Sequence, residues 1–355
     1  MKNSSKYHVL GLMSGTSLDG LDMAHCTFEK RDNRWVYKLN AAETINLPER
    51  LSAKLKSATN LSGEHLTELD NELGRWYGTC VNDFLKDKAL KTDLIASHGH
   101  TVFHQPERGI TLQIGSGVQL HVMTDLPVVN DFRSKDVALG GQGAPLVPIG
   151  DKLLFSEYSM CLNLGGIANV SFNKAGKRLA FDIGACNMVL NYLAEKLGLV
   201  YDEYGLQAES GVVNSQLKEA LNQWDYYSKS YPKSLGYEDV SGQVFPIIEN
   251  STLSIQDKLA TYCDHLACQI TNAVAETKGK LLVTGGGAFN NHLIERITFH
   301  LPKAIEMILP DSSLISFKEA IVFAFLGVLR IQGEINCLSS VTGASRDCSA
   351  GVIYE

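Results

Sequence analysis

Three glycine-rich segments contain the residues best suited to bind phosphate. They cover residues 11–22, 163–170 and 284–290, and the third lies between an apolar run and a helical pattern. Glycine lets the backbone approach an anion closely and turn its N–H groups toward it, and a following helix adds positive partial charge. The first segment could also be a serine-rich hairpin turn, and the second a plain type I′ turn. Together, the three segments predict binding of a polyphosphate.

Asp182 is the carboxylate best placed for proton transfer. It ends a short apolar run and precedes Gly184 and a helical pattern. A carboxylate at the carboxyl end of a strand can accept a proton from an attacking hydroxyl or water. Aspartate is also a common helix N-cap, and the residues alone do not favour one role over the other.

Three histidines follow another apolar run. His98, His100 and His104 have a spacing similar to that of a metal site, since the first two would share one face of a strand. Gly99 indicates a tight turn instead, so we expect polar groups that line a sugar site rather than zinc ligands. Arg133 could form a surface ion pair or recognise a carboxylate through its guanidinium group.

The elements that must position these residues form two similar series. Each begins with a strand, a glycine-rich turn and two more strands, and then adds helices. The predicted strands are 7–11, 21–28, 34–39 and 93–97, then 160–164, 168–172, 179–182 and 280–283. The predicted helices are 49–59, 64–89 and 117–123, then 188–197, 253–278, 290–301 and 317–332. This weak repeat predicts two α/β lobes with a ligand cleft between them.

Glycine-rich residues 139–145 mark the expected boundary between the lobes. We expect a first lobe at residues 1–135 and a second at 136–355, with the last ~20 residues packing back on the first lobe.

Charge and composition exclude several classes of protein. A net charge of −7 argues against nucleic acid as a partner. The apolar runs are too short to cross a membrane and the N-terminal residues contain no secretory signal, which predicts a cytoplasmic protein without a membrane partner. Eight cysteines are scattered without a CxxC pair. This spacing is a poor disulfide framework and a poor zinc site, so we expect mostly buried thiols in a reducing compartment.

Several motifs resemble those of the anhydro-N-acetylmuramic acid kinases. Residues 11–22 resemble the family signature, and further matches run in order from residue 8 to the C-terminus. The further motifs are Ser97-His98-Gly99-His100-Thr101, Asp131-Phe132-Arg133, residues 140–148, residues 163–169, residues 285–290 and Lys318-Glu319-Ala320. The resemblance implies the two-lobed sugar kinase, Hsp70 and actin fold, which is ribonuclease H-like, with ATP held between the lobes.

The resemblance also implies a bacterial enzyme of cell-wall (peptidoglycan) recycling that uses ATP and Mg²⁺. Such a kinase adds water to 1,6-anhydro-N-acetylmuramic acid and phosphorylates O6, which gives N-acetylmuramic acid 6-phosphate. It further implies a homodimer. The alternatives are a kinase for another hexose or amino sugar that opens no ring, and a nucleotide-binding regulator with weakened catalysis.

The resemblance assigns roles to individual residues. Asp182 matches the catalytic base that activates water. The expected sugar-binding residues are His98, His100, Arg133 and Glu319, with Arg133 meeting the lactyl carboxylate. The expected ATP-binding residues are Gly15, Thr16, Ser17, Leu18, Asp19, Gly20, Leu21, Asp22, Gly165, Gly166, Gly285, Gly286 and Gly287. No residue is assigned to the metal.

The run after Asp182 departs from the family pattern. Many relatives have Thr-Gly-Pro-Gly-Asn here, whereas residues 183–187 of this chain are Ile-Gly-Ala-Cys-Asn. The change removes a hydroxyl beside the base and alters the stiffness of the loop, but Asp182 and Asn187 are retained.

Overall fold

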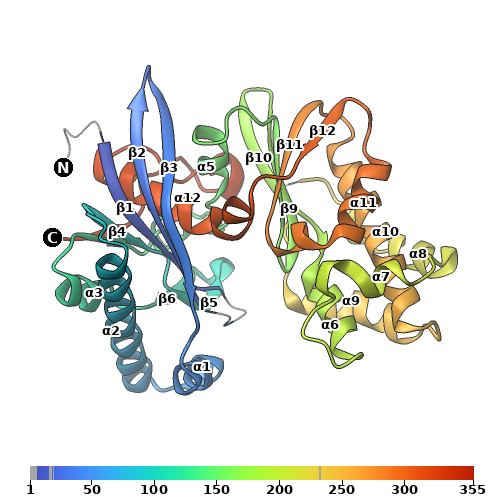
Figure 1. Cartoon of the computed structure of the whole chain (residues 1–355), viewed down its shortest axis with the longest axis horizontal. Coiled ribbons are helices and arrows are strands. Elements are labelled where there is room, and N and C mark those ends of the chain that lie inside the picture. The colour runs from blue at the N-terminus through green and yellow to red at the C-terminus, as the bar shows by residue number, and fades with distance from the viewer. Residues whose placement is uncertain (1–5, 16–17, 19, 232) are drawn as a thin grey trace. The chain divides into compact units, whose positions relative to one another are not determined.

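The chain contains two compact units, each built on its own β-sheet (Figure 1). The computed structural model describes residues 6–15, 18, 20–231 and 233–355. The first unit comprises residues 1–155 and 317–355, and the second comprises residues 156–316. Helices cover both sheets, which confirms the predicted α/β class. Among the described residues, no helix is both long enough and apolar enough to cross a membrane.

The first unit contains a six-stranded sheet with the order β13-β7-β4-β1-β2-β3. Its strands are β1 (Lys6–Met13), β2 (Leu21–Arg31), β3 (Arg34–Ile45), β4 (Leu94–Ser97), β7 (Val128–Asn130) and β13 (Val352–Tyr354). The first three strands pair antiparallel, as the predicted meander requires, and β4 then joins β1 in parallel. A small hairpin of β5 (His100–Gln105) and β6 (Ile110–Ile114) forms a separate sheet.

Helices cover both faces of this sheet. One face packs on α2 (Gly63–Asp87), whose Leu69, Leu73 and Tyr77 share a buried core with residues of β1 and β2. The other face receives α12 (Ser312–Gln332), and only glycine at position 11 permits this contact, because an added Cβ would lie 2.0 Å from the Ala320 carbonyl oxygen. The remaining helices are α1 (Glu49–Lys56), α3 (Gly117–Thr124), α4 (Ser134–Ala138), α5 (Pro148–Leu153) and α13 (Ser339–Thr342).

The second unit repeats this plan with a five-stranded sheet of order β10-β9-β8-β11-β12. Its strands are β8 (Met160–Leu164), β9 (Ile167–Lys174), β10 (Lys177–Ala185), β11 (Gly279–Thr284) and β12 (Ile305–Ile308). Again, three antiparallel strands come first, and a later strand pairs in parallel with the first of them. The repeat predicted from the sequence is therefore a repeat of sheet topology.

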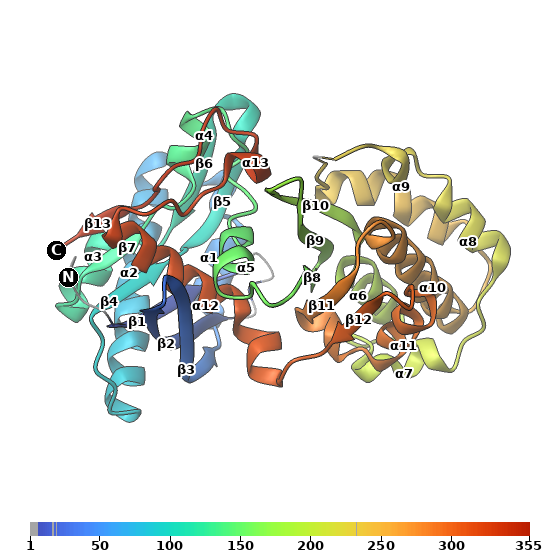
Figure 2. The same cartoon turned by 90° about the horizontal axis from the view of Figure 1, so that it is seen from above.

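The helices of the second unit gather on one side of its sheet (Figure 2). They are α6 (Asn187–Glu195), α7 (Leu206–Glu209), α8 (Ser215–Asn222), α9 (Tyr237–Glu249), α10 (Ile255–Val274) and α11 (Asn291–His300). Helix α10 is the central one, since Tyr262, Leu266 and Ile270 on it are fully buried in the core that the strands share.

The compact units do not coincide with the predicted division at residue 135. Residues 136–155 belong to the first unit because Asp136 binds the glycine-rich segment to it: its side chain accepts a hydrogen bond from Gly143 N at 2.8 Å and another from Thr342 Oγ1 at 2.8 Å. Residues 317–355 also belong to the first unit, which is a longer return than the one expected. The glycine-rich segment is thus a supported loop of the first unit and not the start of the second.

Candidate active site

Asp182 lies near the end of β10, in a position that its neighbours fix through the backbone. Its side-chain Oδ2 accepts a hydrogen bond from Leu235 N at 2.9 Å. Its own N–H donates to the Lys233 carbonyl oxygen at 3.1 Å, and its carbonyl oxygen accepts from the Tyr226 hydroxyl at 2.7 Å. The strand has a bulge between Asp182 and Gly184, a feature that often re-aims a side chain beside an active site. Helix α6 has Cys186 as its N-cap, so the alternative role of Asp182 as a helix cap is wrong.

Burial gives Asp182 the proton affinity of a base. Burial raises the pKa of Asp182 to about 6, and the hydrogen bond from Leu235 opposes the rise. Such a carboxylate is ionised at neutral pH but binds a proton more tightly than an ordinary aspartate does. Burial also raises the pKa of Tyr226, so its hydroxyl remains a hydrogen-bond donor. Asp182 is therefore suited to take a proton from water.

The raised pKa predicts that Asp182 lowers stability at neutral pH. The folded protein binds this proton more tightly than the unfolded chain, so the contribution to stability is largest below the ordinary aspartate pKa and is lost as pH rises through about 6. Replacing Asp182 with asparagine should raise the free energy of unfolding relative to the wild type. This gain should be about 2 kcal/mol larger at pH 8 than at pH 4. Urea unfolding at both pH values measures this difference. Glu219→Gln, at an exposed carboxylate of the same unit, should show no such gain, and an equal gain in both variants would contradict the prediction.

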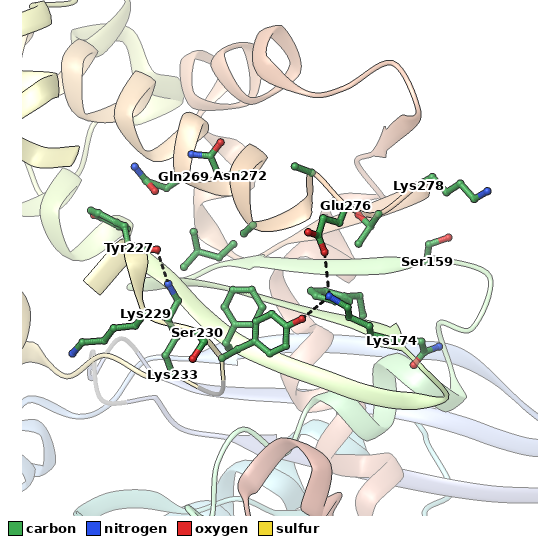
Figure 3. A pocket seen from close by; sticks show the side chains of 18 of the residues that line it. Ser159, Lys174, Tyr227, Lys229, Ser230, Lys233, Gln269, Asn272, Glu276 and Lys278 are labelled. Carbon is green, nitrogen blue, oxygen red and sulfur yellow. Dashed lines mark hydrogen bonds and ion pairs between the residues drawn. The ribbon is translucent and has the colours of Figure 1, made fainter. Parts of the chain in front are cut away.

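A pocket of about 900 Å³ opens beside the strand that carries Asp182 (Figure 3). Phe181 lines it and stacks on Tyr231, with ring centroids 5.2 Å apart. Lys174 bridges the Tyr231 hydroxyl at 2.8 Å and Glu276 at 3.1 Å. Asp182 is not among the residues that line this pocket. The pocket wall instead supports the segment that binds the Asp182 backbone, since Lys233 Nζ donates to the Tyr226 carbonyl oxygen at 3.1 Å.

The turn at Gly165 and Gly166 joins β8 to β9 and is tied to the start of α6. The Gly166 carbonyl oxygen accepts hydrogen bonds from Cys186 N at 2.8 Å and Met188 N at 3.1 Å, and the Gly165 carbonyl oxygen accepts from Asn187 N at 3.1 Å. A Cβ added to Gly166 would meet no atom within 4 Å, so this side of the turn faces open space. The carbonyl oxygens of the turn therefore cap the start of α6 and hold the turn against this helix.

The run that departs from the family pattern is held by hydrogen bonds on both sides. The Tyr262 hydroxyl donates to the Ala185 carbonyl oxygen at 2.8 Å, and Asn187 Nδ2 donates to the Leu164 carbonyl oxygen at 3.0 Å. Ile183 itself is buried. The loop is thus fixed without the proline found in many relatives.

The glycines at 285–287 allow the loop after β11 to pack closely against residues 163–164 at the end of β8. Gly285 has a φ of +86°, and an added Cβ would lie 2.6 Å from Asn163 Oδ1. A Cβ on Gly287 would lie 2.8 Å from the Leu164 Cβ atom. Both glycines are therefore needed for close packing as well as for any ligand. Gly286 differs, because its nearest neighbour would be Asn187 Nδ2 at 3.5 Å.

Gly286 and Gly287 border a second pocket of about 410 Å³. Three partly exposed aromatic rings line it, and asparagine side chains supply both donors and acceptors. Its lining residues are Asn187, Leu190, Asn191, Tyr201, Asp202, Glu203, Tyr204, Gly286, Gly287, Phe289 and Asn290. The sequence prediction missed residues 201–204. Tyr201 is 57% exposed and Tyr204 is 54% exposed, and such exposure of aromatic side chains is the signal that marks them in the structure.

In the first unit, His98 and Arg133 form a hydrogen-bonded chain. Arg133 Nε donates to His98 Nε2 at 2.9 Å, and His98 Nδ1 donates to the Gly99 carbonyl oxygen at 2.8 Å. Arg133 also donates from its NH1 group to the Gly143 carbonyl oxygen at 2.6 Å. Burial and the charge of Arg133 hold the pKa of His98 well below its usual value, so the ring is neutral. His98 therefore orients Arg133, and Gly99, with a φ of +77°, makes the expected turn.

Charge interactions link Arg133 to Glu319, and Glu319 in turn to Asp22. Burial raises the pKa of Glu319 on α12, whereas the charges of Arg133 and Lys318 oppose the rise. Burial lowers the pKa of Arg133 to about 10, and the charge of Glu319 opposes this. Asp22 also raises the pKa of Glu319 and accepts a hydrogen bond from Thr44 Oγ1 at 2.6 Å. The first unit thus brings Asp22, Arg133 and Glu319 into one electrostatic cluster.

Part of the expected ATP loop lies outside the described residues, namely Thr16, Ser17 and Asp19. Among its described residues, Leu18 N donates to the Gly15 carbonyl oxygen at 3.4 Å, and Leu18 has a φ of +61°. The ends of the loop are anchored, because Gly20 and Leu21 are buried where β2 begins. Ser14 Oγ lies 3.5 Å from His100 Nδ1, which places His100 beside this loop.

Comparison with known proteins gives one consistent family. Residues 7–355 match the model of a family described as anhydro-N-acetylmuramic acid kinase. A protein of that name from Aliivibrio fischeri is 37% identical, with 97% of this chain and 98% of the relative covered. Another of that name from Saccharophagus degradans is 34% identical, again with 97% and 98% covered. A ROK family glucokinase from Streptomyces griseus, solved with glucose and AMPPNP, has 11% identity and a TM-score of 0.41 over 90% of this chain and 99% of its own.

Proposed function

This chain belongs to the anhydro-N-acetylmuramic acid kinase family, and from that premise we propose the reaction that its residues perform. It converts 1,6-anhydro-N-acetylmuramic acid, ATP and water into N-acetylmuramic acid 6-phosphate and ADP. The observation that carries the proposal is Asp182, a carboxylate whose pKa burial raises to about 6 and whose position three backbone or side-chain hydrogen bonds fix.

Asp182 acts as the general base in this proposal. Its carboxylate takes a proton from water as the water oxygen attacks C1 of the sugar, which breaks the bond between C1 and O6. The released O6 then attacks the γ-phosphorus of ATP, and the bond to the β,γ-bridging oxygen breaks. Water therefore supplies the new hydroxyl at C1, and ATP supplies the phosphoryl group at O6.

The second unit also supplies the nucleotide site. We assign the base of ATP to the pocket bordered by Gly286 and Gly287, because aromatic rings and asparagine amides there suit a flat heterocycle. Gly166 faces open space at the turn between β8 and β9, which lets a phosphate group approach the backbone closely there. Residues 15–22 of the first unit, with Leu18, Gly20, Leu21 and Asp22 among the described ones, are assigned to the phosphates by the family match.

Mg²⁺ is the metal that the proposal requires. Asp22 offers carboxylate oxygens at the start of β2, next to the proposed phosphate loop, and oxygen ligands are those that Mg²⁺ prefers. We therefore assign Asp22 to the ion, directly or through water. When bound, Mg²⁺ neutralises charge on the phosphate oxygens.

The first unit recognises the sugar in this proposal. Arg133 binds the lactyl carboxylate, because a guanidinium group matches a carboxylate with two parallel hydrogen bonds. His98 acts through Arg133, since both of its ring nitrogens already have partners. Glu319 and His100 are assigned to sugar hydroxyl groups.

The proposal also includes the setting in which the enzyme works. Its substrate is a fragment of the bacterial cell wall, so the reaction belongs to cell-wall recycling. We propose a cytoplasmic location, as the sequence composition predicts, and a homodimer, which follows from the family resemblance.

The test is a reaction in water labelled with heavy oxygen. Purified protein with ATP, Mg²⁺ and 1,6-anhydro-N-acetylmuramic acid should give a phosphorylated product that contains one labelled oxygen at C1, as measured by mass spectrometry. A control with open-ring N-acetylmuramic acid, quenched before its C1 hydroxyl exchanges with solvent, should give no labelled phosphorylated product. Phosphorylation of the open-ring sugar alone would contradict the proposal and indicate a kinase that opens no ring.

Filling the proposed nucleotide pocket should weaken ATP binding. A Cβ on Gly286 meets only one atom at 3.5 Å, so a larger side chain extends into the pocket without strain elsewhere. Gly286→Val should raise the KM for ATP by about tenfold, with Gly286→Ala between it and the wild type. Gly63→Val, at an open position in the first turn of α2, is the control and should leave this KM unchanged. Equal KM values in all four proteins would place the nucleotide elsewhere.

A further inference from the structure

Two buried cysteines of the first unit face each other across a β-bridge. Cys337 N donates to the Cys348 carbonyl oxygen at 3.0 Å, and Cys348 N donates back to the Cys337 carbonyl oxygen at 3.1 Å. A residue pair with both of these bonds has its Cα atoms about 5.5 Å apart, which is within the range that a disulfide spans. The two Sγ atoms and an oxygen of Asp136 all lie within 4.8 Å of one another.

The thiols also belong to the network that supports Arg133. Cys337 Sγ donates to Asp136 Oδ1 at 3.0 Å, and Asp136 Oδ2 accepts from Gly143 N at 2.8 Å. The Gly143 carbonyl oxygen in turn accepts from Arg133 at 2.6 Å. Asp136 also accepts from Thr342, so both of its oxygens are committed to the protein. The Cys337 thiol therefore connects this network to Cys348 on the other side of the bridge.

We propose that Cys337 and Cys348 form a reversible disulfide bond with each other. The oxidant is a low-molecular-weight disulfide. The Cys348 thiolate attacks one sulfur of the oxidant and releases one thiolate from it. The Cys337 sulfur then attacks Cys348 and releases the second. The protein loses two electrons and two protons, and the oxidant becomes two thiols, so the exchange is balanced.

Charge and access select Cys348 as the attacking residue. Contact with the Cys337 side chain lowers the pKa of Cys348, and the charge of Lys135 acts in the same direction, whereas burial, Asp136 and Asp347 oppose the change. The same contact, together with burial, raises the pKa of Cys337. Cys348 directly follows three exposed residues, 345–347, which are the route by which a small oxidant reaches it.

Oxidation should affect the binding of the sugar. A disulfide removes the hydrogen bond from Cys337 to Asp136, so the loop that holds Arg133 loses part of its support. This consequence rests on the proposed role of Arg133, whereas formation of the disulfide does not. We expect the KM for the anhydro sugar to rise by about three- to tenfold on oxidation and to return after reduction.

The test uses full-length protein carrying Cys268→Ser, because Cys268 is the one cysteine of the chain that is not buried and would form its own adduct. After treatment with glutathione disulfide under native conditions, intact mass should fall by two hydrogen atoms. Peptide mapping without reduction should show the Cys337–Cys348 cross-link, and dithiothreitol should reverse both changes. Adding Cys348→Ala should abolish the loss of mass.

Two outcomes would overturn the proposal. One is an unchanged mass in the folded protein when the unfolded protein forms disulfides under the same treatment. The other is a glutathione adduct that persists on Cys348 without closure. Because mass and peptide mapping do not depend on activity, the disulfide can be established even where the kinase assay fails.

Discussion

Replacing Asp182 with asparagine should lower kcat for the anhydro sugar by about a thousandfold, since a positioned general base contributes about 10²- to 10⁴-fold. The change keeps the size of the side chain and leaves an oxygen that can accept the bond from Leu235 N. The KM for ATP should change little, because Asp182 is not among the residues that line the proposed nucleotide pocket. Steady-state assays of ADP release with both substrates varied measure these constants.

The pH profile separates a base from a residue that only supports the fold. Since burial raises the pKa of Asp182 to about 6, wild-type kcat/KM should fall as pH decreases through about 6. The residual activity of Asp182→Asn should lack this limb. Glu219→Gln, the same change from carboxylate to amide at an exposed position, should keep both the rate and the profile. An Asp182→Asn enzyme with wild-type kcat would exclude the proposed mechanism.

Replacing Arg133 with methionine should lower kcat/KM for the anhydro sugar by about a hundredfold, because two charge-assisted hydrogen bonds to the lactyl carboxylate are lost. The effect should depend on the substrate. Wild-type enzyme should strongly prefer the natural acid over its carboxamide, and Arg133→Met should treat the two alike. Kinetic assays of both proteins with both substrates measure this double-mutant cycle.

Arg330→Met is the matched control for loss of a partly buried arginine. Arg330 Nε donates to the Gly351 carbonyl oxygen at 2.7 Å, much as Arg133 donates to Gly143, but no sugar contact is proposed for it. Arg330→Met should keep the preference for the acid. If Arg133→Met keeps that preference as well, the carboxylate is recognised by another residue.

Local sequence patterns determine many of the strands and helices of this fold. In both units, apolar strands separated by a short turn form an antiparallel meander, and a later strand joins in parallel. These strands and the long helices α2 and α10 follow from patterns within each segment. Strand β7 and the C-terminal strand β13 were missed because they are only three residues long and pair with segments far away in sequence.

The candidate site contains features that local sequence patterns do not predict. Glycine content predicted the loops at 165–166 and 285–287, but the aromatic side of the proposed nucleotide pocket includes residues 201–204, which have no local signal for it. Likewise, His98 fitted a sugar ligand in sequence, whereas in the structure its partners are Arg133 and Gly99. A partner that lies far along the chain cannot be identified from residue type alone.

The sequence by itself placed Asp182 near the end of a strand, before a glycine and a helix, and showed eight scattered cysteines, whereas the structure extends that strand to Ala185. Only the tertiary structure decided what these residues can do. Burial raises the pKa of Asp182 to about 6 and a bond from Leu235, distant in sequence, fixes its side chain, while a β-bridge brings Cys337 and Cys348 together. The physical reason is the same in both cases: desolvation and contact depend on segments that meet only when the chain folds.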